Sequence, residues 1–120
     1  MAKHYKELLV WQKAMELVTE VYRAAATFPK HEEFGLASQL KRAAVSIPSN
    51  IAEGQGRLSV GEFKQFLGHA RGSLFEVETQ LLIAKDLDLI GKDDSERLGE
   101  RIAEVGRLLN GLIRSLRTGH

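Results

Sequence analysis

The chain has 120 residues, a length that supports one domain with a modest core, and we predict a single domain over residues 1–120. An apolar share of 43% and a charged share of 28% are typical of globular proteins and argue against a disordered chain. The net charge is only +1, so any affinity for nucleic acid must come from the placement of charges rather than from their sum.

The lack of cysteine and of long apolar segments narrows the class of protein further. The sequence contains no cysteine, which excludes disulfides, thiolate metal sites and cysteine catalysis, and fits a reducing compartment. Its apolar runs fall far short of the roughly 20 residues that a membrane-spanning helix needs. The N-terminus also lacks the apolar segment of a signal peptide. We therefore expect a cytoplasmic protein that does not enter a membrane.

Apolar residues recur with helical spacing and strand signals are nearly absent, so the predicted fold class is all-α. Four helices are expected, over residues 6–27, 35–54 and 59–86 and from residue 93 or 94 onward. Connections of a few residues make neighbouring helices antiparallel, which gives an up-down-up-down four-helix bundle.

The first helix carries two apolar stripes. The one that we assign to the core steps by 4, 3, 4, 3 and consists of Trp11, Met15, Val18, Tyr22 and Ala25. A second stripe widens the apolar surface and consists of Val10, Leu17, Val21 and Ala24. This surplus has two interpretations of similar weight, a broad core or a contact between subunits.

The second helix contains a proline. Its core face is formed by Leu36, Leu40, Ala43 and Ile47. Pro48 lacks an N–H and crowds the carbonyl of Ala44, so we predict a kink between these two residues. Asn50 falls where the next core residue belongs, and we expect it to be partly buried, hydrogen-bonded and register-setting.

Capping residues separate the second and third helices. Gly54 and Gly56 are expected to supply the cap at the C-terminus of the second helix. Ser59 and Glu62 have the spacing of a capping box, in which each residue satisfies a free backbone N–H of the other.

The third and fourth helices have the most regular seams. The third follows an average step of 3.5 residues, which predicts left-handed, coiled-coil-like packing, and its seam is Val60, Phe63, Leu67, Ala70, Leu74, Val77, Leu81 and Ala84. The seam of the fourth is Leu98, Ile102, Val105, Leu109, Leu112 and Leu116. Surplus apolar residues beside these seams are Phe75, Leu82, Ile83, Leu108 and Ile113.

Polar residues beside the seams predict a structural network that fixes the register of the helices. We assign to it Asn50, Glu53, Arg71, Glu78 and Gln80. Glu78 is expected roughly level with Arg101, and Arg71 roughly level with Glu20.

No catalytic constellation is visible. None of the four histidines has a motif partner, and the Glu-x-x-His pairs of di-iron bundles are absent, so we expect no metal and no cofactor. Glu53, Glu76 and Glu78 are better interpreted as salt-bridge partners than as paired catalytic acids. The run from Gly54 to Arg57 lacks the full phosphate-loop pattern and is interpreted as a turn. We predict that the protein is not an enzyme.

Basic residues offer candidate contacts to nucleic acid, although a solvated face of mixed charge is the alternative. The candidates are Lys41, Arg42, Arg57, Lys64, Arg107 and Arg114. In a ring-shaped oligomer, one basic face per subunit would be repeated into a continuous basic surface.

Three segments carry a resemblance to a known family: LLVWQKAMELVTEVY, FGLASQLKRAAVSIPSNIAEGQGR and EFKQFLGHARGSLFEVETQLLIAK. They resemble the four-helix bundle proteins encoded within intervening sequences of bacterial 23S ribosomal RNA genes. The resemblance implies a homopentameric ring and no catalytic residues. It also implies kinship with the accessory variability bundle protein of diversity-generating retroelements, which binds nucleic acid and a reverse transcriptase through a basic surface.

The leading functional hypothesis is therefore a non-enzymatic bundle that assembles with itself and binds RNA or DNA. The alternative is a protein–protein scaffold that docks a partner enzyme such as a reverse transcriptase.

Overall fold

The computed structural model describes residues 4–119, with side chains described through residue 116. The ends of the domain predicted over residues 1–120 lie outside this range. Within it the elements are a short 3-10 turn η1 (Tyr5–Glu7), helix α1 (Leu9–Ala25), a second 3-10 turn η2 (Lys30–Glu32), and helices α2 (Leu36–Gln55), α3 (Val60–Asp86) and α4 (Lys92–Gly119). The described residues contain no strand, and the predicted all-α bundle of four helices is confirmed.

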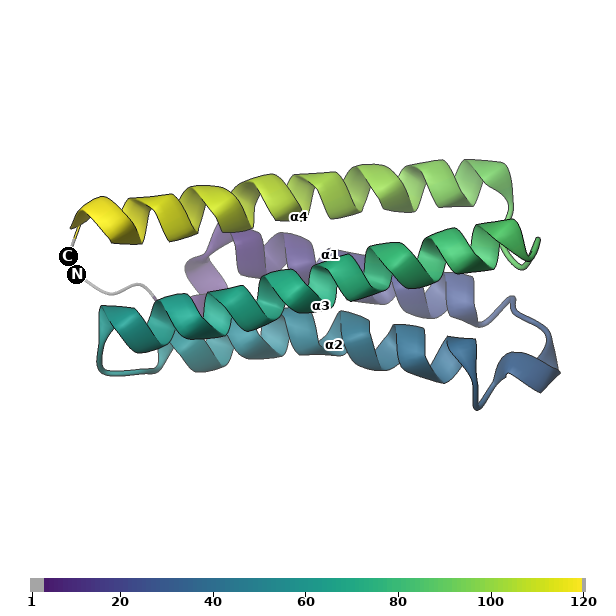
Figure 1. Ribbon diagram of the computed structural model, residues 1–120, viewed down its shortest axis with the longest axis horizontal. Coiled ribbons are helices and arrows are strands. Elements are labelled where there is room, and N and C mark those ends of the chain that lie inside the picture. The colour runs from purple at the N-terminus through teal and green to yellow at the C-terminus, as the bar shows by residue number, and fades with distance from the viewer. Residues whose placement is uncertain (1–3, 120) are drawn as a thin grey trace.

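The helices pack side by side along one long axis of 46 Å, and each runs opposite to the one before it (Figure 1). The connection between α2 and α3 lies at the same end of the bundle as the last turns of α4. We call this the α2–α3 end. The opposite end carries the turn between α3 and α4, and we call it the α3–α4 end. These two ends differ in charge, as described below.

Helix α1 buries the apolar stripe that we did not assign to the core. Its buried stripe is Val10, Ala14, Leu17, Val21 and Ala24. Of the predicted core stripe, Met15 and Tyr22 are 42% and 46% exposed, and Trp11 and Val18 are only partly buried. The prediction for the core face of α1 was therefore wrong, and the stripe that begins with Val10 is not available for subunit contact.

The seams of α3 and α4 lie in the core as predicted, apart from their ends. The buried seam residues are Leu67, Ala70, Leu74, Val77, Leu81, Ala84, Leu98, Ile102, Val105 and Leu109. Leu108 and Ile113 pack against this core, whereas Phe75, Leu82 and Ile83 are exposed. The left-handed sense of the packing stays a prediction.

Helix α2 passes through Pro48 without a break in its helical assignment. Ser46 donates its hydroxyl to the carbonyl of Ala43 at 3.0 Å, and Asn50 donates Nδ2 to the carbonyl of Ser46 at 2.7 Å. Asn50 is partly buried, so its expected burial and hydrogen bond are confirmed. The kink between Ala44 and Pro48 stays a prediction.

Gly54 has a different role from the predicted one. It lies inside α2 and is buried, whereas Gly56 is the C-cap residue as predicted and donates its backbone N–H to the carbonyls of Ala52 and Glu53. A Cβ atom added at Gly54 would lie 2.7 Å from Cβ of Phe66 and 3.0 Å from Cδ1 of Phe63. Glycine at this position therefore allows α2 and α3 to approach closely.

The capping box at the start of α3 forms in part. The Glu62 backbone N–H donates to Ser59 Oγ at 3.1 Å, as predicted. The return contact differs, because the Ser59 hydroxyl donates to Glu62 Oε1 at 3.3 Å. The cap and the first turn of α3 are thus fixed by the Ser59 hydroxyl.

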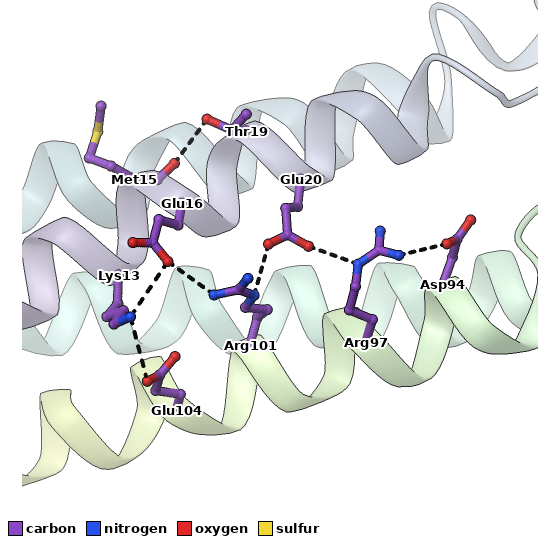
Figure 2. A network of polar contacts seen from close by, with 9 residues as sticks. All are labelled: Lys13, Met15, Glu16, Thr19, Glu20, Asp94, Arg97, Arg101 and Glu104. Carbon is purple, nitrogen blue, oxygen red and sulfur yellow. Dashed lines mark hydrogen bonds and ion pairs between the residues drawn. The ribbon is translucent and has the colours of Figure 1, made fainter.

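A ladder of ion pairs joins α1 to α4 (Figure 2). Glu20 is only 9% exposed and accepts from two arginines: Arg97 Nε lies 2.9 Å from Glu20 Oε1, and Arg101 Nε lies 2.8 Å from Glu20 Oε2. The ladder continues through Asp94, Glu16, Lys13 and Glu104. The hydrogen bond to Glu20, followed by that to Asp94, raises the pKa of Arg97 above its ordinary value.

This ladder replaces two pairings that we expected. Glu20 meets Arg97 and Arg101 rather than Arg71, and Arg101 meets α1 rather than Glu78. Arg71 instead donates Nη1 to Asn110 Oδ1 on α4 at 3.0 Å. Height along the bundle does not by itself select the partner, since Glu20 and Arg71 both turn toward α4 rather than toward each other.

The remaining members of the predicted network lie in separate places. Glu53 is exposed and pairs with Arg57 at 2.8 Å within one turn. Gln80 is 7% exposed, and its Oε1 has no hydrogen-bond partner among the described residues. Asn50, Glu53 and Gln80 therefore share no hydrogen bond or ion pair with one another in the described part of the chain.

Replacing Gly54 with alanine tests the close approach of α2 and α3. We expect Gly54→Ala to lower the free energy of unfolding by about 1–3 kcal/mol, because the new methyl group overlaps Phe66 and Phe63. The control is Gly99→Ala on α4, where a Cβ meets nothing within 4 Å. That change should stabilise the helix by about 0.5–1 kcal/mol. Urea unfolding followed by circular dichroism measures both, and a neutral Gly54→Ala would contradict the account.

Replacing Glu20 with glutamine tests the ladder. We expect Glu20→Gln to cost about 1–2 kcal/mol of unfolding free energy, because two arginines lose their shared carboxylate. The matched variant Glu16→Gln removes a half-exposed carboxylate and should cost less than about 0.5 kcal/mol. Equal losses in urea unfolding would show that Glu20 has no special place in the ladder.

Candidate nucleic-acid interface

Several cations of the bundle are already engaged by other side chains. Lys13, Arg97 and Arg101 belong to the α1–α4 ladder. Arg57 pairs with Glu53 and lies 4.6 Å above the centre of the Phe66 ring. Such cations are partly neutralised or held by their neighbours, so a binding surface must be sought among the others.

The six predicted contact residues do not form one patch. Lys41 faces α1, where its Nζ lies 5.4 Å from the centre of the Tyr22 ring. Arg42 lies in an open depression between α2 and α3, beside Phe34 and Glu76. Arg57 lies in the turn between α2 and α3. These three residues are on separate surfaces.

The other three predicted residues, Lys64, Arg107 and Arg114, gather with Arg71 on α3 and α4. Arg107 and Arg114 are exposed and lie two turns apart on α4, on either side of Asn110. The hydrogen bond from Arg71 to Asn110 places the guanidinium of Arg71 between their levels. Lys64 lies two turns before Arg71 on the same side of α3. We call this cluster of four cations the α3–α4 basic face.

No carboxylate lies in the segments that carry this face. Residues 63–75 of α3 and residues 105–116 of α4 contain no Asp or Glu at all. The two segments pack together, since a Cβ added at Gly106 would lie 3.5 Å from Cδ2 of Leu74. In Figure 1 they are the teal start of α3 and the yellow end of α4. These two segments therefore contain no internal counter-ion, although Glu100 and Glu104, just before the segment of α4, line one depression with Arg107.

The acidic residues concentrate at the opposite end. Residues 76–104, which form the rest of α3, the turn and the first part of α4, hold nine Asp and Glu against four Lys and Arg. This segment carries a net charge of −5. The net charge of +1 is therefore the sum of unequal regions. The bundle is acidic toward its α3–α4 end and basic on α3 and α4 toward its α2–α3 end.

A second surface is apolar and lies between α1 and α2. The half-exposed Met15 and Tyr22 lie on it, next to the partly buried Val18 and to Val45 of α2, which is 39% exposed. The contact of Lys41 with Tyr22 shows that α1 and α2 meet along this line. We call it the α1–α2 stripe. Its water-exposed apolar area is suited to association with another surface.

The described residues show no metal-binding group: no three His, Asp or Glu side chains among them lie close enough to hold an ion. None of the helices in the described range has an apolar stretch long enough to span a membrane. The arrangement offers cations and apolar side chains at the surface, which suits binding.

Arg71 is absent from the predicted contacts because we assigned it to the structural network. One signal in the sequence could have found it. Arg71 lies in a segment without acidic residues, seven positions after the predicted contact Lys64. The contact between α3 and α4, which brings Arg71 to Arg107 and Arg114, required the structure.

Comparison with known proteins agrees with the architecture. The chain is similar to a solved structure of a protein of unknown function from the S23 ribosomal protein family of Bacteroides thetaiotaomicron, with a TM-score of 0.82 and 22% sequence identity. The match covers 88% of this chain and 96% of that one, and at this identity it shows the shared fold alone. No curated protein matches the sequence.

The family model described as 23S rRNA-intervening sequence protein matches residues 6–111. This range includes nearly all of the bundle, from the first turn to the basic part of α4. The chain belongs to the 23S rRNA-intervening sequence protein family.

Proposed function

We propose that the protein is a non-enzymatic bundle that assembles with itself and binds RNA or DNA through the α3–α4 basic face. The observation that carries this proposal is the cluster of Lys64, Arg71, Arg107 and Arg114 in two packed segments without acidic residues. The proposed location is the cytoplasm, whose reducing conditions suit a chain without cysteine.

The chemistry of this face suits phosphate. Three of its four cations are arginines, whose planar guanidinium groups can donate two parallel hydrogen bonds to one phosphate. Arg71 has one N–H bound to Asn110, which holds its guanidinium in place and leaves other donors free. Each phosphate contact releases counter-ions, so binding should weaken steeply as salt rises.

Self-assembly would repeat this face. The α1–α2 stripe offers half-exposed apolar side chains to a second copy of the chain. The family resemblance implies a homopentamer, in which the basic faces of the subunits would join into one continuous surface. Because potentials of neighbouring subunits add, a small cluster on each subunit can support binding by the whole ring.

A protein–protein scaffold is the alternative function, and one feature favours it. The depression between α2 and α3 is lined by Phe34 and Arg42, with Phe34 89% exposed at its rim. An exposed aromatic beside an arginine is typical of side chains that anchor protein interfaces. A reverse transcriptase, or another enzyme, could dock on such a surface.

Removing two arginines of the basic face tests nucleic-acid binding. We expect Arg107→Gln with Arg114→Gln to weaken binding of a structured RNA about tenfold or more at low salt, and to reduce the slope of log K against log salt by about 2. Filter binding across a salt titration measures both quantities.

The matched control is Lys85→Gln with Lys92→Gln, which removes the same charge at the acidic end of the bundle. It should change the affinity less than about twofold. Equal losses from both pairs would assign binding to total charge rather than to this face. If the unaltered protein retains no RNA even at low salt, the nucleic-acid proposal fails.

A charge on the α1–α2 stripe tests self-assembly. We expect the unaltered protein to sediment as an oligomer at micromolar concentration and Met15→Glu to sediment as a monomer, because a buried, unpaired carboxylate opposes association. Circular dichroism should show that the variant keeps its helix content. The control Leu82→Glu adds the same charge to the exposed side of α3 and should remain oligomeric. Dissociation by Leu82→Glu alone would move the interface to α3.

A further inference from the structure

An exposed aromatic side chain adjoins the α3–α4 basic face. Phe75 lies one turn after Arg71 on the same side of α3 and is 55% exposed. Side chains of an α-helix lean toward its N-terminus, which directs the ring of Phe75 toward the turn that holds Arg71. An apolar ring of this size in water, next to arginines, is not explained by the core.

The ring of Phe75 differs from most other surface aromatic rings in having no partner. Phe66 is covered by Arg57 and packs edge-on to His69, and Tyr22 is covered by Lys41. No ring or cation contacts Phe75 within the part of the chain that the structure describes. The exposed part of its ring, 55% of the residue, therefore has no aromatic or cationic partner and is available for stacking.

Phe34 is the other exposed aromatic without such a contact, and its surroundings are less suited to nucleic acid. It follows Glu32 and Glu33 directly in the sequence and shares its depression with Glu76. Arg42 is the cation of that depression. Carboxylates this close would repel a phosphate backbone. Phe75 also borders carboxylates, Glu76 and Glu78, but it adjoins the cluster of arginines that begins with Arg71, so it is the better placed of the two.

Two glycines lie on the surface of α3 beside Phe75. Gly72 and Gly68 lie on its side of α3, one and two turns before it, and a Cβ at either would meet nothing within 4 Å. Glycine in an exposed helix disfavours the helix relative to alanine, so the open backbone here is not required for folding. The surface above these two glycines therefore has space for a planar group.

We propose that the α3–α4 basic face binds single-stranded nucleic acid, with the ring of Phe75 stacking on an unpaired base while Arg71, Arg107 and Arg114 contact the flanking phosphates. This inference rests on the proposed function and adds the class of ligand. Cations that follow a backbone, combined with an aromatic ring for bases, are the features by which proteins bind single strands. A duplex keeps its bases stacked inside and offers this face only phosphates.

The test compares a single-stranded RNA oligonucleotide with a duplex of the same length by fluorescence anisotropy. The unaltered protein should bind the single strand about tenfold more tightly than the duplex. Phe75→Leu keeps an apolar side chain but removes the ring. It should weaken single-strand binding about tenfold and leave duplex binding within about twofold.

Two controls separate this inference from the proposed function. Phe34→Leu removes the other free ring and should change neither affinity, whereas Arg107→Gln with Arg114→Gln should weaken both ligands alike. Salt-dependent binding without a preference for the single strand, or a Phe75→Leu variant that binds both ligands normally, would overturn the inference and leave the proposed function standing. Absence of binding to either ligand would overturn both.

Sedimentation of Phe75→Leu completes the test. The variant should sediment as the unaltered protein does, since its ring is assigned to the ligand. A change in oligomeric state would identify Phe75 as a subunit contact and would overturn the stacking role. The salt slope for single-strand binding should be unchanged by Phe75→Leu, because the ring carries no charge.

Discussion

The contacts of the Glu20 carboxylate determine where the two candidate binding surfaces of this bundle lie, the α3–α4 basic face and the α1–α2 stripe. It is nearly buried and accepts from Arg97 and Arg101 of α4. A buried charge has to be paired, so this contact fixes the rotation of α1 about its own axis. With Glu20 facing α4, one apolar stripe of α1 points into the core and the stripe with Met15 and Tyr22 points outward. The same contact neutralises the two arginines in the first half of α4.

Separation of charge along the bundle is a consequence of that neutralisation. Arg97 and Arg101 are held by Glu16 and Glu20 of α1, and Arg97 also by Asp94. Arg107 and Arg114 follow the ladder along α4 in a segment without acidic residues, and Arg107 shares a depression with Glu104 at the end of the ladder. A chain with almost no net charge can therefore present a local positive potential, because interactions between surface charges fade beyond about 10 Å at moderate salt.

The sequence predicted the fold well because helical periodicity is a local property. The four helices and the seams of α3 and α4 follow from spacing alone, and so does the partial burial of Asn50. The core face of α1 could not be predicted in this way, since both of its stripes have the same period. The contact of Glu20 with Arg97 and Arg101, more than 70 positions away, distinguishes them. The candidate site could be predicted only in part for the same reason. Its cations could be named from the sequence, but which of them lie together depends on how α3 packs against α4.

Exposed glycines and an exposed ring on one side of α3 need a physical explanation, as a buried charge does. The seam of α3 already supplies the bundle with its core residues, so Phe75, Gly68 and Gly72 contribute little to folding. Each instead has a cost, because the ring exposes apolar area and the glycines weaken the helix. Ligand binding would explain such costs on a face that also lacks acidic residues. A partner with flat bases and a phosphate backbone would cover the ring, use the open backbone and neutralise Arg71 at the same time.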